Sequence, residues 1–434
     1  MAEFFIAVIC ITAFCKLIFY FRNLIIVRSY LSNAILPTVE IRNLREDCSM
    51  LILIPVIREQ NIICQTLDHF MSMNVENINL YIAIAGTSRE TNDNGILSTG
   101  DVVNEWILRQ DLSVGNIRDV FFCEAKELNG DRATQLNYAV LCFQEKYPSR
   151  KLDYIGVYDA DSLPSVETLQ QVRQIFTTNQ SIVACQQPVH FIKAANRMAA
   201  EGKNPLLVAS AIYQTTWTAI RELPSWIRYA QSPAEELFCE NIYLIGHGEF
   251  LRFETYNMFK FPEFEVTDGI QLGYRLGMSN KKISPLKEFC DDDVPQNIVG
   301  LINQHKRWFG GCMNLYGAYK WSYEHFGIKS IFQLVDGYWS QMCWAWASLS
   351  IIIALFVAIM THDMTATVIL GLIVIVYSYV IPLAAHLVLP GKIKVRFSDW
   401  MVLPLAIALK GIGPNYFILE KIVCGNVKFK KVER

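Results

Sequence analysis

Apolar and polar residues alternate along the middle of the chain in a pattern that predicts strands separated by helices. Short apolar runs predict buried strands, and apolar residues three and four positions apart predict amphipathic helices. The predicted strands are residues 50–55, 79–85, 119–123, 154–158, 182–188, 241–245 and 282–285. The predicted helices include residues 61–73, 102–108, 194–229 and 295–308. Strands that alternate with helices are typical of βαβ units, so we expect an α/β domain with a doubly wound, mostly parallel sheet.

A longer apolar run near the N-terminus predicts a membrane-spanning helix. Residues 4–21 are apolar except for Thr12 and Lys16, and a helix of this length just crosses a bilayer at about 1.5 Å per residue. A cleaved signal peptide is the alternative, but no basic residue precedes this run, whereas Arg22 follows it. We expect an anchor with its N-terminus outside, the rest of the chain cytoplasmic, and residues 23–47 along the membrane surface.

Two further apolar runs near the C-terminus predict a membrane hairpin. Residues 338–360 and 367–389 are each long enough to span, and a short polar segment joins them. The basic residues that follow, from Lys392 onward, favour the cytoplasmic side for the returning chain. Residues 400–423 are interrupted into pieces too short to span, so we expect interfacial helices there. The interruptions are Pro404, Lys410 and Pro414.

The composition fits a polar domain joined to a few membrane segments. The chain has 434 residues, 52% of them hydrophobic and 18% charged, and its net charge of −2 gives no indication of nucleic-acid binding. Its 12 cysteines include no Cys-x-x-Cys pair, which favours free thiols in a reducing compartment over disulfides or a zinc site. So few spans, without inward-facing charges and beside so large a polar domain, argue against a transporter.

Two carboxylates stand where the predicted strand 154–158 ends. Asp159 and Asp161 flank the small Ala160, and because side chains alternate along an extended chain, both acids can project to one side. Such a pair suits a hard divalent cation that takes waters and substrate phosphates as its other ligands. It also lies outside a carboxyl strand end, where open α/β sheets bind ligands. The alternative is a solvated turn, because Asp-x-Asp often occurs by chance.

A second motif lies on the predicted helix that precedes the hairpin, where Gln304, Arg307 and Trp308 have the spacing Gln-x-x-Arg-Trp. With the Asp159–Asp161 pair, it resembles the membrane-bound branch of glycosyltransferase family 2, which includes cellulose, chitin and hyaluronan synthases. Other segments resemble the same family in the same order: residues 55–59, 132–137, 246–252, 267–268 and the basic ending 431–434. The ordered set is far more specific than any one motif.

The resemblance implies a domain plan and a location. It implies a GT-A-type, Rossmann-like catalytic domain over residues 48–330, with a mixed, mostly parallel sheet. The flanking parts would be an anchor and interfacial segment over 1–47, a hairpin over 331–390, and interfacial helices with a basic tail over 391–434. It places the catalytic domain in the cytoplasm, at the plasma membrane.

The resemblance also implies a reaction and residues that perform it. A sugar would move from a nucleotide diphosphate, with a UDP-sugar favoured, to a growing polysaccharide, with inversion. Mg²⁺ or Mn²⁺ would bind Asp161 with Asp159 assisting, and Asp268 would take the acceptor's proton. The implied substrate-binding residues are Pro55, Glu59, Arg132, Asp159, Gln304, Arg307 and Trp308. Single addition to a lipid or lipid-linked acceptor, and a catalytically degenerate scaffold, are the alternatives; an oligomer or export partner would complete a translocation path.

This chain departs from the family pattern at two places. The family's second strand usually ends in Asp-Asp-Gly, whereas here residues 84–87 are Ile-Ala-Gly-Thr and the next acid is Glu90. The family's catalytic Asp aligns with Gly269, and Asp268 takes the place of the preceding Glu. A shift of one residue on the entry turn would bring Asp268 into the same space; otherwise the base is misplaced or absent.

Several candidate residues have a simpler alternative. Asp268 is also a good helix cap, Arg307 a juxtamembrane cation, and Trp308 a membrane-interface anchor. His247, between two glycines, is more simply a packed histidine than an acceptor contact. Aromatic and polar residues along 194–229 are candidates for an acceptor groove, although most such residues are core. These are Tyr213, Gln214, Trp217 and Trp226. The acidic run 291–293 is usually a solvated loop rather than a metal site.

Overall fold

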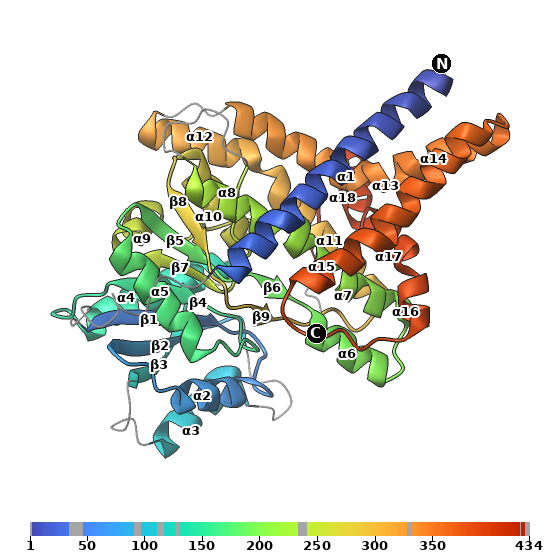
Figure 1. Cartoon of the computed structure of the whole chain (residues 1–434). Coiled ribbons are helices and arrows are strands. Elements are labelled where there is room, and N and C mark those ends of the chain that lie inside the picture. Colours follow the sequence, from blue (N-terminus) through green and yellow to red (C-terminus); the bar gives the residue numbers. More distant parts are fainter. Residues whose placement is uncertain are drawn as a thin grey trace.

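The computed structural model describes residues 2–33, 47–90, 97–110, 117–126, 130–232, 241–327, 331–425 and 427–429. It contains an α/β domain with a group of long helices on one side (Figure 1). Most of the predicted interfacial segment after residue 33, and the basic ending 431–434, lie outside the described residues.

A mixed, mostly parallel sheet forms the centre of the α/β domain. Its strand order is β3-β2-β1-β4-β7-β5-β8, and only β7 runs antiparallel to its neighbours β4 and β5. The strands are β1 (Cys48–Pro55), β2 (Ile78–Thr87), β3 (Ile117–Ala125), β4 (Tyr154–Val157), β5 (Ile182–Gln186), β7 (Glu249–Arg252) and β8 (Lys282–Pro285). The predicted fold class is therefore confirmed. Strands β6 (Val189–His190) and β9 (Cys290–Asp291) form a separate parallel pair.

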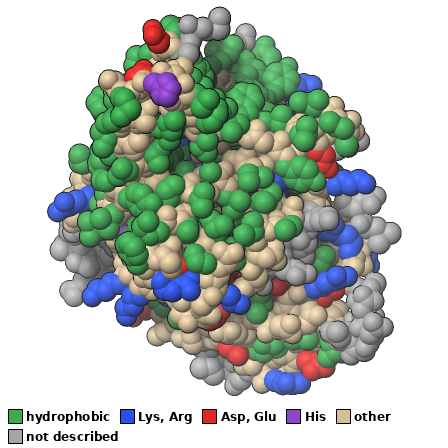
Figure 2. Space-filling view, turned by 90° about the vertical axis from the view of Figure 1, so that its right-hand side faces the viewer, with side chains coloured by type: hydrophobic (Ala, Val, Ile, Leu, Met, Phe, Trp, Pro, Cys, Tyr) green, Lys and Arg blue, Asp and Glu red, His purple; other side chains and the backbone are tan. Residues whose placement is uncertain are grey.

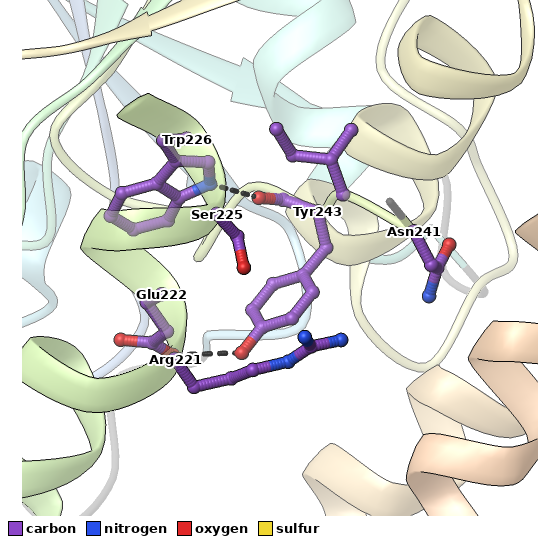
Figure 3. Close-up of a pocket in the computed structure, with 7 residues that line it drawn as sticks. Arg221, Glu222, Ser225, Trp226, Asn241 and Tyr243 are labelled. Atoms are coloured by element: carbon purple, nitrogen blue, oxygen red, sulfur yellow. Dashed lines mark hydrogen bonds between the residues drawn. The ribbon is translucent and has the colours of Figure 1, made fainter. Parts of the chain in front are cut away.

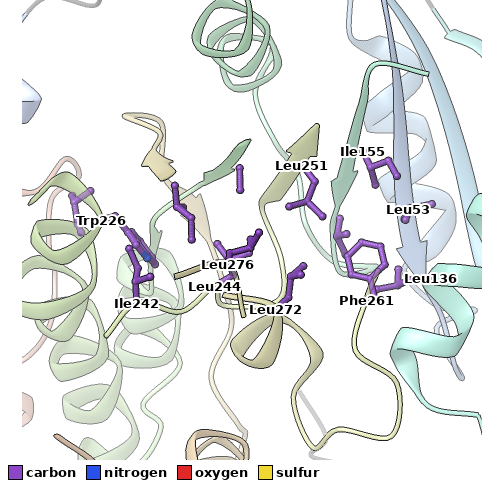
Figure 4. Packing of buried hydrophobic residues seen from close by; sticks show 14 of the residues in the cluster. Leu53, Leu136, Ile155, Trp226, Ile242, Leu244, Leu251, Phe261, Leu272 and Leu276 are labelled. Carbon is purple, nitrogen blue, oxygen red and sulfur yellow. The ribbon is translucent and has the colours of Figure 1, made fainter. Parts of the chain in front are cut away.

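Helices cover both faces of the sheet, which explains why its central strands β1 and β4 are almost wholly apolar. Alternate residues of β1 enter different cores: Leu51 and Leu53 lie in one, Ile52 and Ile54 in the other. Figure 4 shows the first core, where Leu53 and Ile155 lie near Leu136. The covering helices are α2 (Ile63–Ser72), α3 (Thr99–Arg109), α4 (Arg132–Lys146) and α5 (Val166–Thr178).

Two predictions about the second half of the domain were wrong. Residues 241–245 are not a strand; the strand is β7, which begins after Gly246 and Gly248, both with positive φ (88° and 59°). These left-handed residues turn the chain, so β7 pairs antiparallel. The predicted helix 194–229 is interrupted, because Asn204 caps a new helix that has proline at its first position. Its parts are α6 (Ile192–Ala200), α7 (Pro205–Trp217), the π-turn η2 (Thr218–Glu222) and α8 (Leu223–Gln231).

Helices complete the domain towards the C-terminus. They are α9 (Phe253–Phe259), α10 (Asp268–Met278), α11 (Ile298–Met313) and α12 (Leu315–Phe326). The predicted helix 295–308 corresponds to α11, which extends to Met313 and carries Gln304, Arg307 and Trp308.

Three helices are long and apolar enough to cross a membrane. These are α1 (Ala2–Ser32), α13 (Ile331–Met360) and a continuous helix made of α14 (Met364–Ile375), η3 (Val376–Val380) and α15 (Ile381–Val388). Helix α1 contacts α13, α14 and α15. The N-terminus and the turn between α13 and α14 lie at the same end, away from the sheet (Figure 1).

The outer face of this group is apolar, as a lipid-facing surface requires. Large side chains such as Phe14, Phe356 and Leu387 are 61%, 62% and 80% exposed. Figure 2 shows hydrophobic side chains covering most of this face, with Lys and Arg gathered along its lower border. Short helices follow where interfacial helices were predicted: α16 (Phe397–Met401), α17 (Leu403–Leu409) and α18 (Ile412–Cys424).

Candidate active site

A small cavity lies between α8 and the segment before Gly246, and it is too small for a sugar or a nucleotide. Its volume is about 10 Å³, which suffices for one water molecule. Figure 3 shows the Trp226 indole donating to the Tyr243 carbonyl at 2.9 Å and the Tyr243 hydroxyl donating to Glu222 at 2.9 Å. Trp226 is only 1% exposed, so it belongs to the core and lines no acceptor groove.

The two predicted metal-binding acids lie at the carboxyl end of β4. The Tyr158 amide continues the parallel pairing by donating to the Leu53 carbonyl at 3.0 Å. The chain then turns, because the Ser162 amide donates to the Asp159 carbonyl at 3.0 Å. The Asp159 side chain is 29% exposed, and Asp161 is half-buried. Both acids therefore stand at the sheet edge where open α/β sheets bind ligands.

Arg132 joins Asp159 to Asp268 by a forked contact. Its Nη1 donates to Asp268 Oδ2 at 2.7 Å, and its Nη2 donates to Asp159 Oδ1 at 3.1 Å and to the Gly246 carbonyl at 2.5 Å. Arg132 is the first residue of α4, whose start is fixed by a capping box between Asp131 and Thr134. Burial alone disfavours its charge, but the Asp268 and Asp159 carboxylates raise the pKa of Arg132 above its usual value. Three predicted site residues therefore meet in one place.

Asp268, rather than residue 269, presents a carboxylate to this site. A Cβ at Gly269 would lie 2.4 Å from the Gly246 backbone, so no aspartate fits there without movement. Asp268 is the first residue of α10, and its side chain, 10% exposed, points to Arg132. Thr267, the N-cap residue of α10, makes no capping hydrogen bond through its side chain. The one-residue shift considered from the sequence thus has a steric reason.

Glu249 is a buried acid beside this site that the sequence did not single out. It begins β7 and is 0% exposed, and no side chain donates a hydrogen bond to its carboxylate within the described part of the chain. Burial, with a smaller effect of Asp268, raises the pKa of Glu249 to about 8, although Arg132 opposes the shift. A carboxyl directly after Gly-x-Gly, at the start of a short strand, was the only signal available.

His247 lies between two acids. Its Nδ1 is 3.9 Å from Asp159 Oδ2, and its Nε2 is 3.9 Å from Asp292 Oδ2. The two acids that flank Asp292 pair with other residues: Asp291 with Lys193 at 2.6 Å, and Asp293 with Arg197 at 2.7 Å. Only the middle acid of the run faces the candidate site.

The side chains at the site provide some, but not all, of the ligands that a divalent ion needs. They are carboxylate oxygens, which Mg²⁺ and Mn²⁺ prefer. Arg132 already occupies one oxygen of Asp159, and no group of three His, Cys, Asp or Glu side chains within the described ranges could hold a metal ion. A metal here would therefore depend on Asp161, Asp159, water and substrate oxygens.

Helix α11 approaches the site through its C-terminal turn. A Cβ at Gly311 would lie 1.8 Å from Thr267 Oγ1, and the Gln271 amide donates to the Gly311 carbonyl at 2.8 Å. Arg307, one turn earlier, and Trp308 are half-buried, whereas Gln304 is 1% exposed. The last turn of α11, which follows the Gln-x-x-Arg-Trp motif, thus packs against the turn that carries Asp268.

The turn after β1 is held by Glu90, the first acid after β2. One Glu90 oxygen accepts from the Thr99 amide at 2.7 Å, and the other accepts from the Arg58 amide at 2.9 Å. The Glu59 amide donates to Thr99 Oγ1 at 2.9 Å, and Pro55 pairs with Ala85. A polar cavity of about 300 Å³ opens here. It is lined by Thr87, Glu90, Ser98, Gly100, Asp101, Asn104, Phe122 and Glu124.

Comparisons with known proteins bear on the fold. No protein-family model matches the chain, and no curated protein sequence matches it. The mannosyltransferase PcManGT from Pyrobaculum calidifontis, solved with GDP-Man and Mn²⁺, matches 97% of this chain and 100% of its own, with 12% identity and a TM-score of 0.55. Residues 1–349 of S. aureus TarS match 87% of this chain and 92% of their own, with 10% identity and a TM-score of 0.39, on which we base nothing. At such identity the likeness to PcManGT shows the fold alone, and the chain therefore has the fold of a glycosyltransferase.

Proposed function

We propose that this protein is a membrane-bound glycosyltransferase that moves a sugar from a nucleotide-diphosphate sugar to an acceptor held at the membrane. The observation that carries the proposal is the Arg132 contact with both Asp159 and Asp268 at the carboxyl end of β4. It gathers two carboxylates and a cation at the position where open α/β sheets bind ligands. PcManGT was solved with GDP-Man, so GDP-sugars stand beside the predicted UDP-sugars as donors.

The proposed reaction is a direct displacement at the anomeric carbon with inversion. The acceptor hydroxyl attacks as the nucleoside diphosphate leaves, and the hydroxyl proton passes to Asp268. Positioned general bases of this kind contribute about 10²–10⁴-fold. Arg132 holds the Asp268 carboxylate in place through the 2.7 Å contact. The geometry of the base thus depends on a residue from a different helix.

Asp161 and Asp159 are the residues that would hold Mg²⁺ or Mn²⁺. When bound, such an ion neutralises charge on the departing diphosphate. PcManGT was solved with Mn²⁺, which supports this assignment by analogy of fold. Arg307 adds a planar cation suited to phosphate oxygens, and Gln304 and Trp308 line the acceptor side of the same helix. Pro55 and Glu59 belong to the turn that would receive the nucleotide.

For the acceptor we propose a growing polysaccharide, with single addition to a lipid-linked acceptor as the second candidate. The specific observation that favours a lipid-linked acceptor is Lys410, which lies between α17 and α18 and donates to the Tyr213 hydroxyl. The topology proposed is a cytoplasmic catalytic domain at the plasma membrane, with the N-terminus and the α13–α14 turn outside. Product length distinguishes repeated extension from single addition.

The test is turnover by the purified full-length protein. Release of UDP or GDP and the size of the labelled product are measured with a panel of UDP- and GDP-sugars, Mn²⁺ and a membrane extract as acceptor. We expect release with at least one donor and its loss in Asp161→Asn. An absence of turnover with every donor, in protein that melts cooperatively, would indicate a scaffold and contradict the proposal.

A further inference from the structure

Lys410 lies between α17 and α18, beside aromatic side chains. It follows the last residue of α17, and its Nζ donates to the Tyr213 hydroxyl at 2.5 Å. The same Nζ lies 4.2 Å from the centre of the Tyr213 ring and 4.8 Å from that of Trp217. The Trp344 indole donates to the Lys410 carbonyl at 3.1 Å, so α13 holds the backbone as well. The ammonium group is therefore held at a defined place.

No carboxylate compensates this cation within the described part of the chain. Burial lowers the pKa of Lys410 to about 7, and the nearby charge that adds to the shift is another cation, Lys16 of α1. Lys306, which is buried, does have an acidic partner: it pairs with Glu420, and it also donates to the Lys428 carbonyl at 2.9 Å. A cation held in place without an acid, in a low-dielectric setting, is stabilised by a bound anion.

Polar side chains extend from Lys410 towards the candidate active site. Gln214, next to Tyr213, donates to His305 Nε2 at 3.3 Å, which leaves the proton on His305 Nδ1. Burial, with a smaller effect of Lys410, lowers the pKa of His305 to about 3, so the ring is neutral. His305 Nδ1 and Gln304 Oε1 are buried and have no hydrogen-bond partner in the described structure. One donor and one acceptor thus remain for a ligand between Lys410 and the motif helix.

The position of Lys410 favours an anion that carries a lipid tail. Lys16 lies on the apolar helix α1, and the Tyr213 hydroxyl is 2.9 Å from the hydroxyl of Tyr377 in the membrane hairpin. Lipid phosphates lie at the membrane–water interface, at the level expected for short interfacial helices such as α17. A phosphate there places its attached saccharide towards His305 and Gln304.

We propose that Lys410 binds the phosphate of a lipid phosphate or lipid diphosphate acceptor, with its saccharide running along His305 towards Asp268. The inference rests on the proposed function, whose acceptor class it names. It is compatible with either product length, because a single sugar or a long chain can be carried on such a lipid. Tyr213 and Trp217, considered from the sequence for an acceptor groove, would flank the phosphate.

Direct binding tests the proposal without turnover. Full-length protein in phosphatidylcholine nanodiscs is titrated with a radiolabelled C20 prenyl phosphate, with no nucleotide sugar present. We expect Lys410→Gln to weaken binding about tenfold or more, because it removes a charge-assisted hydrogen bond. Lys410→Arg keeps the charge and should bind within a few-fold of the unchanged protein. Lys421→Gln, an exposed lysine of α18, is the matched control and should bind normally.

Competition identifies the source of the phosphate. Neither inorganic phosphate nor phosphatidylglycerol should displace the prenyl phosphate at equal concentration. Displacement by the first would indicate a free-anion site, and displacement by the second a structural lipid site; either result overturns the proposal. So does unchanged binding by Lys410→Gln, or equal loss in Lys410→Arg and Lys410→Gln while both melt like the unchanged protein.

Donor hydrolysis separates this inference from the proposed function. Without any lipid acceptor, the unchanged protein should still release nucleoside diphosphate to water, and this release tests the proposed function alone. Prenyl phosphate binding that depends on Lys410, in a protein that turns over no donor, would overturn the proposed function and leave the phosphate site standing.

Discussion

At the scale of single residues, Arg132 decides the geometry of the candidate site. Its fork holds carboxylates from two elements far apart in sequence, and it accounts for the position of Asp268 despite the glycine at 269. Lysine cannot reproduce this contact, because an ammonium is a point charge without a planar fork. The site therefore depends on guanidinium geometry as well as on positive charge.

Arg132→Lys should lower turnover by about 10²-fold or more, the size of effect seen when one preorganised donor is removed from an active site. The initial rate of nucleoside diphosphate release measures it. Arg109→Lys is the control, because Arg109 forms an exposed pair with Glu105 and should keep full activity. Full activity in Arg132→Lys would show that the fork is structural only.

Glu249 gives a stability prediction with a defined sign. Its pKa is about 8 in the folded protein against about 4.3 unfolded, so the folded state keeps a proton that the unfolded state has lost between these values. Raising the pH through this window therefore favours unfolding. In thermal melts from pH 5 to 8, the unchanged protein should lose more stability than Glu249→Gln, which cannot ionise. Glu105→Gln, at an exposed acid, should follow the unchanged protein; parallel curves for Glu249→Gln would contradict the burial argument.

At the scale of elements, α1 is fastened to the α/β domain by a buried asparagine. The Asn23 side chain, 0% exposed, donates to the Ile220 carbonyl at 2.6 Å and accepts from Arg228 at 2.6 Å. Asn23→Leu removes both hydrogen bonds and leaves the buried Ile220 carbonyl without the Asn23 donor, so we expect a loss of about 1–3 kcal/mol in stability. Denaturant-induced unfolding in detergent measures it. Arg22→Gln, at the adjacent exposed position, is the control, and an equal loss there would refute a specific contact.

The parallel part of the sheet was predictable from sequence because each strand is an isolated apolar run between helical segments. Strand β7 was missed because its place depends on the left-handed turn at Gly246 and Gly248, which a sequence pattern does not reveal. The break before Pro205 was likewise hidden by helical spacing on both sides of it. Buried segments such as 241–245 look like strands because they are apolar, whether or not they pair.

The candidate site was predictable where chemistry depends on residue type, as at Asp159, Asp161 and Asp268. Contacts made across the fold were not: the Arg132 fork, the burial of Glu249 and the surroundings of Lys410 arise from elements distant in sequence. Lys410 was noticed only as an interruption of an apolar stretch. Its significance depends on the absence of an acid around it among the described residues, which no spacing rule predicts.

At the scale of the whole molecule, the chain combines a glycosyltransferase fold with three helices able to span a membrane. Helix α11 lies between the two parts: its last turn packs on the Asp268 turn, and its buried His305 contacts Gln214 near Lys410. This arrangement suits an enzyme whose donor comes from water and whose acceptor comes from lipid. The central claim is that the donor diphosphate binds at the end of β4.

Titration calorimetry of UDP and GDP on the purified protein tests that claim most directly. We predict that at least one of them binds in the presence of Mn²⁺, that Asp161→Asn weakens this binding about tenfold or more, and that Asp268→Asn leaves it within a few-fold. Binding that is unchanged in Asp161→Asn, or no binding of either nucleotide to folded protein, would contradict the account.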